Sequence, residues 1–376
     1  MIIGIDGNEA NIARRVGIGE YAFELLRQFE GFKIKDLRFK IYLKNKPLDH
    51  MPKEREGWEY KVIGPKKMWT QFALPLYLFS EKVRHLRTQP SVFFSPSHYA
   101  PRFSPIPTAI SIMDLSYIHF PQLFTKHDLY QLVNWTKYSA KQARKIFTIS
   151  NFSRGDIIKI YGKKPEDVIT TYLGIKQIKD LRFKIKDMEE LKKKFAINSG
   201  YILFVGTLQP RKNIEKLIEA FSKIKDKKIK LVIVGKKGWL WEDIVGAPQK
   251  YSVTDRVKFL DFVEDEDLPS LYANALCFVL PSLYEGFGLP VLEAMQNGCP
   301  VITSNVSSLP EVGGDAALYF DPTSADDIAK AIDLVINDEG LRQQMIEKGK
   351  IQVKKFSWEK TARETLNVLE KLGKSS

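Results

Sequence analysis

Short runs of β-branched and apolar residues alternate with amphipathic helical patterns along this chain, and no other feature constrains its fold as strongly. In the first half, apolar runs predict strands at Ile2–Ile5, Phe39–Leu43, Val92–Ser95, Thr108–Ile112 and Lys145–Ile149. Helical spacing predicts helices at Gly19–Phe29, Met68–Arg87, Lys126–Ala143 and Ser153–Tyr161. The second half repeats the alternation, with predicted strands at Tyr201–Val205, Leu231–Val234, Val257–Leu260, Cys277–Leu280, Val301–Thr303 and Ala317–Phe320. Its helices are expected at Asn213–Ile224 and Leu268–Asn274, and from Pro290, Ala325, Glu339 and Phe356. This order indicates an α/β fold with parallel sheets.

The length of 376 residues predicts two domains. The segment Gly174–Gly200 separates the two strand–helix series, is rich in lysine and lacks a strand pattern, so we interpret it as the linker. Each half is then one doubly wound, Rossmann-like domain with ligands at the carboxyl ends of its strands. Two such sheets facing each other would form a cleft.

The net charge of +13 indicates an anionic partner, such as nucleic acid, a membrane surface or a phosphorylated substrate. Residues 1–175 hold 27 basic and 16 acidic residues, a net +11, whereas residues 176–376 carry only +2. Two cysteines exclude a disulfide framework and favour a reducing compartment. The N-terminus reads as a strand rather than a signal peptide and no apolar stretch could span a bilayer, so we expect a cytoplasmic protein.

The segment Leu280–Glu293 has the strongest pattern for chemistry. A buried strand ends there, glycines 286 and 288 permit close backbone approach, and Pro290 suits the first turn of a helix. Free N–H groups and the helix dipole would then favour an anion. Glu285 and Glu293 beside such a site suggest hydroxyl groups of a sugar and a ribose; the alternative is a strand–turn–helix with solvated acids.

A second candidate segment, Phe204–Asn213, runs from a strand into a loop, and we expect Asn213 to cap the next helix. Arg211 and Lys212 are adjacent cations just before that helix, where the dipole disfavours positive charge. A guanidinium beside an ammonium suits a diphosphate. The alternative is a pair of solvated charges.

A third segment, Asp6–Tyr21, leads from the first strand to Gly17 and Gly19 at the start of a helix. A lone Gly-x-Gly lacks the third glycine of a dinucleotide fingerprint. A tight turn therefore explains it as well as a phosphate contact does.

Together, the three segments resemble the family 4 glycosyltransferases, retaining enzymes of GT-B fold that use nucleotide sugars. The resemblance extends over nearly the whole chain, and the Glu-x7-Glu pair of Glu285 and Glu293 is its most specific element. Val205–Asn213, Gly298–Ser304 and Leu309–Val312 match further family patterns. The resemblance implies an acceptor domain at 1–173, a donor domain at 174–355, and a C-terminal helix, 356–376, that packs back on the first domain.

The resemblance also implies roles in binding the nucleotide sugar. Arg211 and Lys212, with Gly206 in the same motif, would meet the donor diphosphate, and Glu293 would bind the ribose. Glu285 would hold the donor sugar and phosphates together with the backbone of the residues that follow it, Gly286, Phe287, Gly288 and Leu289. Gly17 and Gly19 would close over the diphosphate from the other domain, and the base would lie near Phe262 and Val263.

One position departs from the family pattern. Where relatives carry His-Asp after the strand Thr108–Ile112, this chain has Met113 and Asp114. Methionine cannot donate the hydrogen bond that the family histidine gives to the donor sugar. His98 ends the neighbouring strand and could face the same site, or it is a solvated loop histidine; Asp114 would hold hydroxyls or the acceptor.

The implied reaction is glycosyl transfer with retention, in which the departing diphosphate accepts the acceptor's proton and no metal is needed. The resemblance favours GDP-mannose, with UDP-glucose and UDP-N-acetylglucosamine as alternatives. We expect a glycan, lipid-linked or polysaccharide-precursor acceptor. The segment Lys66–Phe79 is either an amphipathic helix at an anionic membrane or a core helix. A UDP-sugar epimerase of GT-B fold is a rival, as is a nucleic-acid-binding protein, although no binding motif for nucleic acid is visible.

Overall fold

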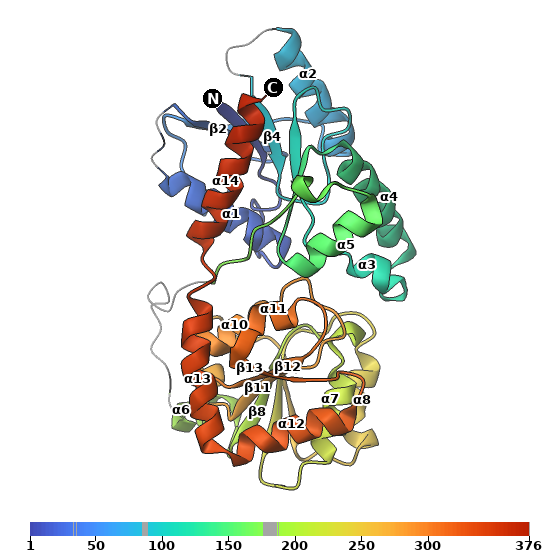
Figure 1. Cartoon of the computed structure of the whole chain (residues 1–376), viewed down its shortest axis with the longest axis vertical. Helices are drawn as coiled ribbons and strands as arrows, with labels where there is room; N and C mark the ends of the chain where they lie inside the picture. The colour runs from blue at the N-terminus through green and yellow to red at the C-terminus, as the bar shows by residue number, and fades with distance from the viewer. Residues whose placement is uncertain (33, 35, 85–88, 176–185, 187, 376) are drawn as a thin grey trace. The chain divides into compact units, whose positions relative to one another are not determined.

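The computed structural model describes residues 1–32, 34, 36–84, 89–175, 186 and 188–375 (Figure 1). The chain forms two compact units. The first consists of Met1–Gly174 and Ser357–Ser376, and the second of Ile175–Phe356. Each observed division lies one residue from the boundary expected from the sequence.

The first unit is built on a seven-stranded sheet in the order β3-β2-β1-β4-β5-β6-β7, and every neighbouring pair is parallel. Its strands are β1 (Ile2–Asp6), β2 (Arg38–Leu43), β3 (Trp58–Val62), β4 (Val92–Ser95), β5 (Thr108–Ser111), β6 (Lys145–Thr148) and β7 (Val168–Thr170). The five predicted strands are confirmed. The sequence analysis missed β3 and β7, the two edge strands.

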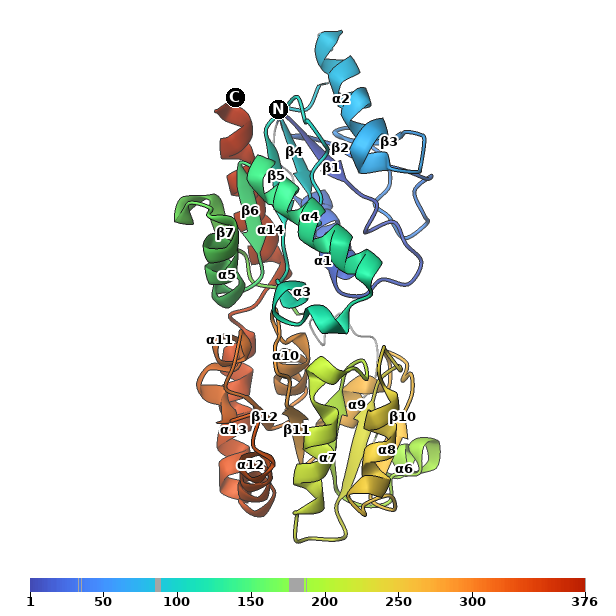
Figure 2. The same cartoon turned by 90° about the vertical axis from the view of Figure 1, so that its right-hand side faces the viewer.

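Helices cover both faces of this sheet. They are α1 (Ile18–Gly31), α2 (Leu74–Val83), α3 (Ser116–His119), α4 (Lys126–Gln142), α5 (Asn151–Tyr161) and α14 (Trp358–Lys374), with 3₁₀ turns at Pro121–Leu123 and Pro165–Asp167. Helices α1 and α14 lie side by side on one face, and α4 and α5 lie on the other (Figure 2). The C-terminal helix therefore belongs to the first unit, where the rings of Tyr21 and Trp358 are 6.4 Å apart.

The helix expected at Met68–Arg87 is divided into two parts. Trp69–Ala73 forms one turn of π-helix and α2 follows it, with Pro75 in its first turn, while residues 85–88 lie outside the described part of the chain. Trp69, Leu74 and Leu78 are buried against the sheet. The interpretation of this segment as a core helix is therefore confirmed for one of its sides.

The second unit contains a six-stranded parallel sheet in the order β10-β9-β8-β11-β12-β13. Its strands are β8 (Tyr201–Val205), β9 (Lys230–Val234), β10 (Val257–Leu260), β11 (Cys277–Leu280), β12 (Val301–Ser304) and β13 (Ala317–Phe320), so all six predictions are confirmed. Its helices are α6 (Met188–Phe195), α7 (Ile214–Ser222), α8 (Glu242–Lys250), α9 (Leu268–Ala273), α10 (Leu289–Gln296), α11 (Leu309–Gly313), α12 (Ala325–Asn337) and α13 (Glu339–Val353), with 3₁₀ turns at Pro210–Lys212 and Gly314–Ala316.

Helix α6 corrects the interpretation of Gly174–Gly200 as a plain linker. Leu191 is fully buried, and Met188 and Phe195 are partly buried at helical spacing from it, a pattern that the sequence analysis overlooked. The remaining linker positions 176–185 and 187 lie outside the described residues. None of the described helices has the length and apolar character needed to cross a membrane.

Candidate active site

The loops after β8 and β11 lie next to each other because these strands are neighbours in the second sheet. The chain leaves β8 toward β9 on one side and leaves β11 toward β12 on the other, so the strand order reverses between them. Ligands of open α/β sheets bind at the carboxyl ends of strands around such a reversal. Arg211 and Lys212 follow β8, and Glu285 follows β11, so the reversal brings the two strongest sequence motifs together.

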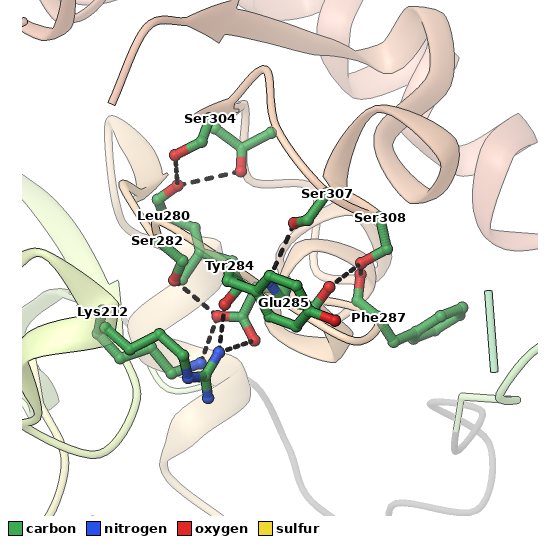
Figure 3. Close-up of polar contacts among 11 residues, drawn as sticks. Lys212, Leu280, Ser282, Tyr284, Glu285, Phe287, Ser304, Ser307 and Ser308 are labelled. Carbon is green, nitrogen blue, oxygen red and sulfur yellow. Dashed lines mark hydrogen bonds and ion pairs between the residues drawn. The ribbon is translucent and has the colours of Figure 1, made fainter. Parts of the chain in front are cut away.

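Glu285 is the centre of a buried polar cluster (Figure 3). Lys212 Nζ donates to Glu285 Oε1 at 2.5 Å, and Arg211 Nη1 lies 3.2 Å from Oε2. Ser282 Oγ donates to Oε1 at 2.6 Å, while the Arg211 guanidinium also donates to the carbonyl of Tyr284. The structure therefore pairs both cations with one carboxylate, a contact that the sequence analysis did not predict. The sugar and phosphate contacts expected for these residues stay predictions.

The charge of Glu285 follows from these neighbours. Burial raises the pKa of its carboxyl, but the charges of Lys212 and Arg211 and the hydrogen bonds from Lys212 and Ser282 outweigh burial and lower the pKa to about 2. Glu285 is thus ionised at neutral pH. Two cations and one carboxylate leave this cluster with a net charge of +1, which favours a further anion.

Hydroxyl groups from the loop after β12 hold the Glu285 loop in place. Ser307 Oγ accepts from the Glu285 N–H at 3.0 Å, and Ser308 Oγ donates to the carbonyls of Glu285 and Phe287 at 2.9 Å each. Ser308 is fully buried. The sequence analysis did not single out these serines, and only their place just before the Leu309–Val312 motif could have drawn attention to them.

Glycines permit the close approach of these loops. Gly288 has a φ of 100°, and a Cβ there would lie 2.6 Å from Leu309. A Cβ on Gly206 would lie 3.8 Å from Lys212 Cε, which places Gly206 beside that side chain. Gly235, which the sequence analysis missed, follows β9, and a Cβ there would lie 1.9 Å from the Gly206 carbonyl oxygen. Gly286 and Phe287 are buried in the same loop, and Leu289 begins α10.

The prediction that Asn213 caps the next helix is confirmed for its position, but the side-chain capping bond expected there is absent. Asn213 occupies the cap position with a φ of 57° but makes no capping bond. Its amide donates instead to the carbonyls of Pro281 at 3.1 Å and Pro322 at 2.8 Å. The side chain thus ties the Arg211–Lys212 turn to the loop after β11, a role that depends on tertiary structure.

The other residues that the sequence analysis expects at the donor site lie at the same edge of the second sheet or in its neighbouring loops. Glu293 lies in α10 and accepts from Tyr272 OH at 3.0 Å. After β10, Val263 is buried, and Phe262 is exposed with Lys236 Nζ 4.5 Å from its ring centre.

In the first unit, the strand order reverses between β1 and β4. Gly17, with a φ of 53°, precedes α1, and a Cβ there would meet nothing within 4 Å. Gly19 is buried in α1, and a Cβ there would lie 3.0 Å from the Glu9 carbonyl oxygen. The close approach of the Glu9 carbonyl therefore explains why residue 19 is a glycine, whereas a side chain at position 17 would meet open space.

Asp114 and His98 follow the neighbouring strands β5 and β4. Asp114 Oδ1 accepts from the Ser116 N–H at 2.8 Å at the start of α3. Burial lowers the pKa of His98, and the charge of Asp114 opposes that shift, so the two groups interact. The buried Nδ1 of His98 has no hydrogen-bond partner among the described residues, which argues against a solvated loop histidine. A further histidine near this edge of the sheet, His119, pairs with Asp156.

In the part of the chain that the structure describes, no three His, Cys, Asp or Glu side chains form a group that could hold a metal ion. Cys277 and Cys299 are both buried and free.

Three comparisons relate the chain to known proteins. Residues 187–352 match the family model for glycosyl transferases group 1. The chain is 31% identical over 369 residues to the O-antigen chain mannosyltransferase B of Escherichia coli, covering 93% of this chain and 95% of that protein. Among solved structures, sucrose-phosphate synthase from Thermosynechococcus elongatus matches with a TM-score of 0.75 at 19% identity, with all of both chains covered. HepE of Anabaena in complex with UDP and glucose matches with a TM-score of 0.74 at 20% identity, covering 98% of this chain and 99% of that one.

Proposed function

This chain belongs to the group 1 glycosyltransferases, a family of GT-B fold, and on that basis we propose that it transfers mannose from GDP-mannose to a growing surface polysaccharide. The cluster of Arg211, Lys212 and Glu285 at the strand reversal carries the proposed donor site. The likeness to an O-antigen mannosyltransferase along nearly the whole chain supports mannose and a glycan acceptor.

In the proposed complex, the donor diphosphate meets the Arg211 and Lys212 cations. The net charge of +1 that Glu285 leaves on the cluster favours the anion, and the N-terminus of α10 adds its partial positive charge. Gly206 and the loop from Gly286 to Leu289 approach the phosphates and sugar with their backbone. Glu293 binds the ribose, and the base lies by Val263.

The proposed transfer retains the configuration of the sugar. The bond from the anomeric carbon to the diphosphate breaks, the acceptor oxygen bonds to the same face, and the acceptor proton passes to an oxygen of the released diphosphate. Stabilisation of that leaving group by the positive charges of Arg211 and Lys212 is the main catalytic contribution, because a diphosphate leaves as an anion. We place the acceptor on the first unit, with Asp114 and His98 as the groups that contact sugar or acceptor hydroxyls.

A thermal-shift screen tests the choice of donor. We expect GDP and GDP-mannose to raise the melting temperature more than UDP or UDP-sugars do, because a ligand that binds only the folded form stabilises it. Incubation with GDP-mannose and a mannan acceptor should then give an elongated product whose new linkage has the donor's anomeric configuration by NMR. A larger shift with UDP-glucose or UDP-N-acetylglucosamine would replace mannose in the proposal, and an inverted linkage would contradict retention.

Removal of divalent metals should leave the rate of transfer unchanged. Arg211 and Lys212 supply the positive charge that a metal ion gives to the diphosphate in other transferases. The measurement is kcat/KM in EDTA compared with kcat/KM in added Mg²⁺ or Mn²⁺. A rate that falls in EDTA and returns with either metal would contradict this part of the proposal.

We also propose that the enzyme works at the cytoplasmic face of a membrane, where a lipid-linked acceptor would be presented. The proposed acceptor chemistry and the net +11 of residues 1–175 support this location.

A further inference from the structure

The π-helical turn Trp69–Ala73 and α2 carry apolar residues on two opposite sides. On the inner side, Leu74 and Leu78 are buried in a core with Tyr42 and Phe93. Glu81, also on this side, is held by Lys40 Nζ at 2.5 Å and by Tyr42 OH at 2.8 Å. The helix is therefore anchored to the sheet by its inner side, and the outer side is not needed for packing.

The outer side presents four large apolar residues to solvent. Phe72 is 53% exposed, Leu76 67%, Phe79 43% and Val83 73%. They follow one another at intervals of four, three and four residues, which is the spacing of one helix face. We call these four residues the α2 outer face. An exposed apolar stripe of this kind marks an interaction surface.

The segment 102–105 extends this surface. It lies along the helix, because the Arg102 N–H donates to the Thr70 carbonyl at 3.0 Å and Lys82 Nζ donates to the Pro105 carbonyl at 2.9 Å. Phe103 is 67% exposed, with a φ of 52°. A large side chain rarely adopts that backbone conformation. Most of the Phe103 ring is in solvent, although it lies edge-to-face with the Tyr138 ring of α4 at 6.2 Å.

The charge around the α2 outer face is predominantly positive. Five exposed cations lie on the helix, on the turn before it and on the neighbouring segment: Lys66, Lys67, Lys82, Arg84 and Arg102. From residue 60 to residue 113, the sequence contains a single acidic residue, Glu81, which is buried in its ion pair with Lys40. The exposed charge of residues 60–113 is therefore positive, and the exposed carboxylate of Glu59 on β3 lies just before this stretch.

We propose that the α2 outer face, with Phe103, binds the surface of an anionic lipid bilayer. The apolar side chains enter the boundary between headgroups and acyl chains, and the surrounding cations contact the lipid phosphates. A second copy of this chain fits the surface poorly, because pairing the face with itself would bring two predominantly cationic rims together. The inference rests on the proposed location at a membrane and deepens it, because it names the surface that binds the bilayer and the lipid chemistry that this surface recognises.

Vesicle flotation without any nucleotide sugar tests the inference. The wild-type chain should float with vesicles of phosphatidylcholine and phosphatidylglycerol and not with phosphatidylcholine alone. The double variant F72S/L76S should bind the anionic vesicles at least about tenfold more weakly, since two exposed apolar side chains lose their burial in the bilayer. The matched control L334S/I351S changes two exposed apolar residues of α12 and α13 and should bind like wild type.

A second pair of variants tests the cations. K66Q/K67Q should weaken binding by about fivefold per lysine removed, an effect that salt screens. K227Q/K228Q, which alters two adjacent exposed lysines of the second unit, should have no effect. Equal flotation with neutral lipid, or wild-type binding by F72S/L76S, would overturn the proposal.

Sedimentation and transfer assays separate the remaining outcomes. If the lipid-free chain dimerises and F72S/L76S makes it monomeric, the face serves self-association and the proposal fails. Transfer of sugar to a water-soluble acceptor should be unchanged in F72S/L76S, whose melting temperature should match wild type. If the wild-type chain transferred no sugar to the water-soluble acceptor, the proposed function would be contradicted, but the flotation result would still support binding to the bilayer.

Discussion

Replacing Arg211 or Lys212 by alanine should lower kcat/KM for sugar transfer by about 10²–10³-fold. Each substitution removes one of the two cations that we place on the leaving diphosphate, in a cluster where Lys212 is only 9% exposed. Low exposure makes each charge more effective than it would be in water. Steady-state kinetics with varied donor concentration gives the value.

Lys216→Ala provides the matched control for this prediction. Lys216 lies one turn into α7 and pairs with Glu219 at 2.8 Å, away from the Glu285 cluster. Its loss should change kcat/KM by less than about twofold, because this partly exposed i,i+3 ion pair belongs to α7 and does not involve Glu285. If Arg211→Ala and Lys212→Ala behaved like Lys216→Ala, the diphosphate would lie elsewhere.

Glu285→Gln should destabilise the folded chain by about 3 kcal/mol at neutral pH, because it leaves two largely buried cations without their carboxylate. The pH dependence has a definite sign. The pKa of Glu285 falls from 4.5 to about 2 on folding, so its stabilisation is present above pH 4.5 and is lost as the pH falls toward 2. Melting temperatures across that range should fall less in Glu285→Gln than in wild type.

Asp267→Asn serves as the control for a buried carboxylate outside the site. Asp267 is fully buried and is held by Lys186 and Lys194. Both variants should lower the melting temperature, but inorganic pyrophosphate should stabilise Glu285→Gln more than Asp267→Asn, since only the former frees cations at the proposed diphosphate site. Equal shifts with pyrophosphate would contradict the assignment.

The sheets were predictable where buried apolar runs form central strands, such as Val92–Ser95 and Cys277–Leu280. The edge strand β3 has the sequence Trp-Glu-Tyr-Lys-Val, whose polar residues point to solvent, and β7 has only three residues. Neither gives a continuous apolar pattern. Helix α6 has only eight residues, and its three apolar residues, Met188, Leu191 and Phe195, are separated by lysines and acids, so their helical spacing was overlooked.

The site was predictable as two motifs but not as one cluster. Spacing and the family resemblance pointed to Arg211, Lys212 and Glu285 separately. Their mutual ion pairs depend on β8 and β11 being neighbours, which no local pattern in the sequence specifies. The same holds for Asn213, whose side chain forgoes the local capping bond for two carbonyls of distant loops.

The central claim is that the Arg211–Lys212 turn binds the diphosphate of the donor. Calorimetric titration of GDP and GMP against wild type and Arg211→Ala tests it most directly, because the two ligands differ only in the terminal phosphate. Wild type should prefer GDP by about tenfold or more, as expected for a hydrogen bond between charged groups, and Arg211→Ala should lose most of that preference. An undiminished preference for GDP in Arg211→Ala would contradict the claim.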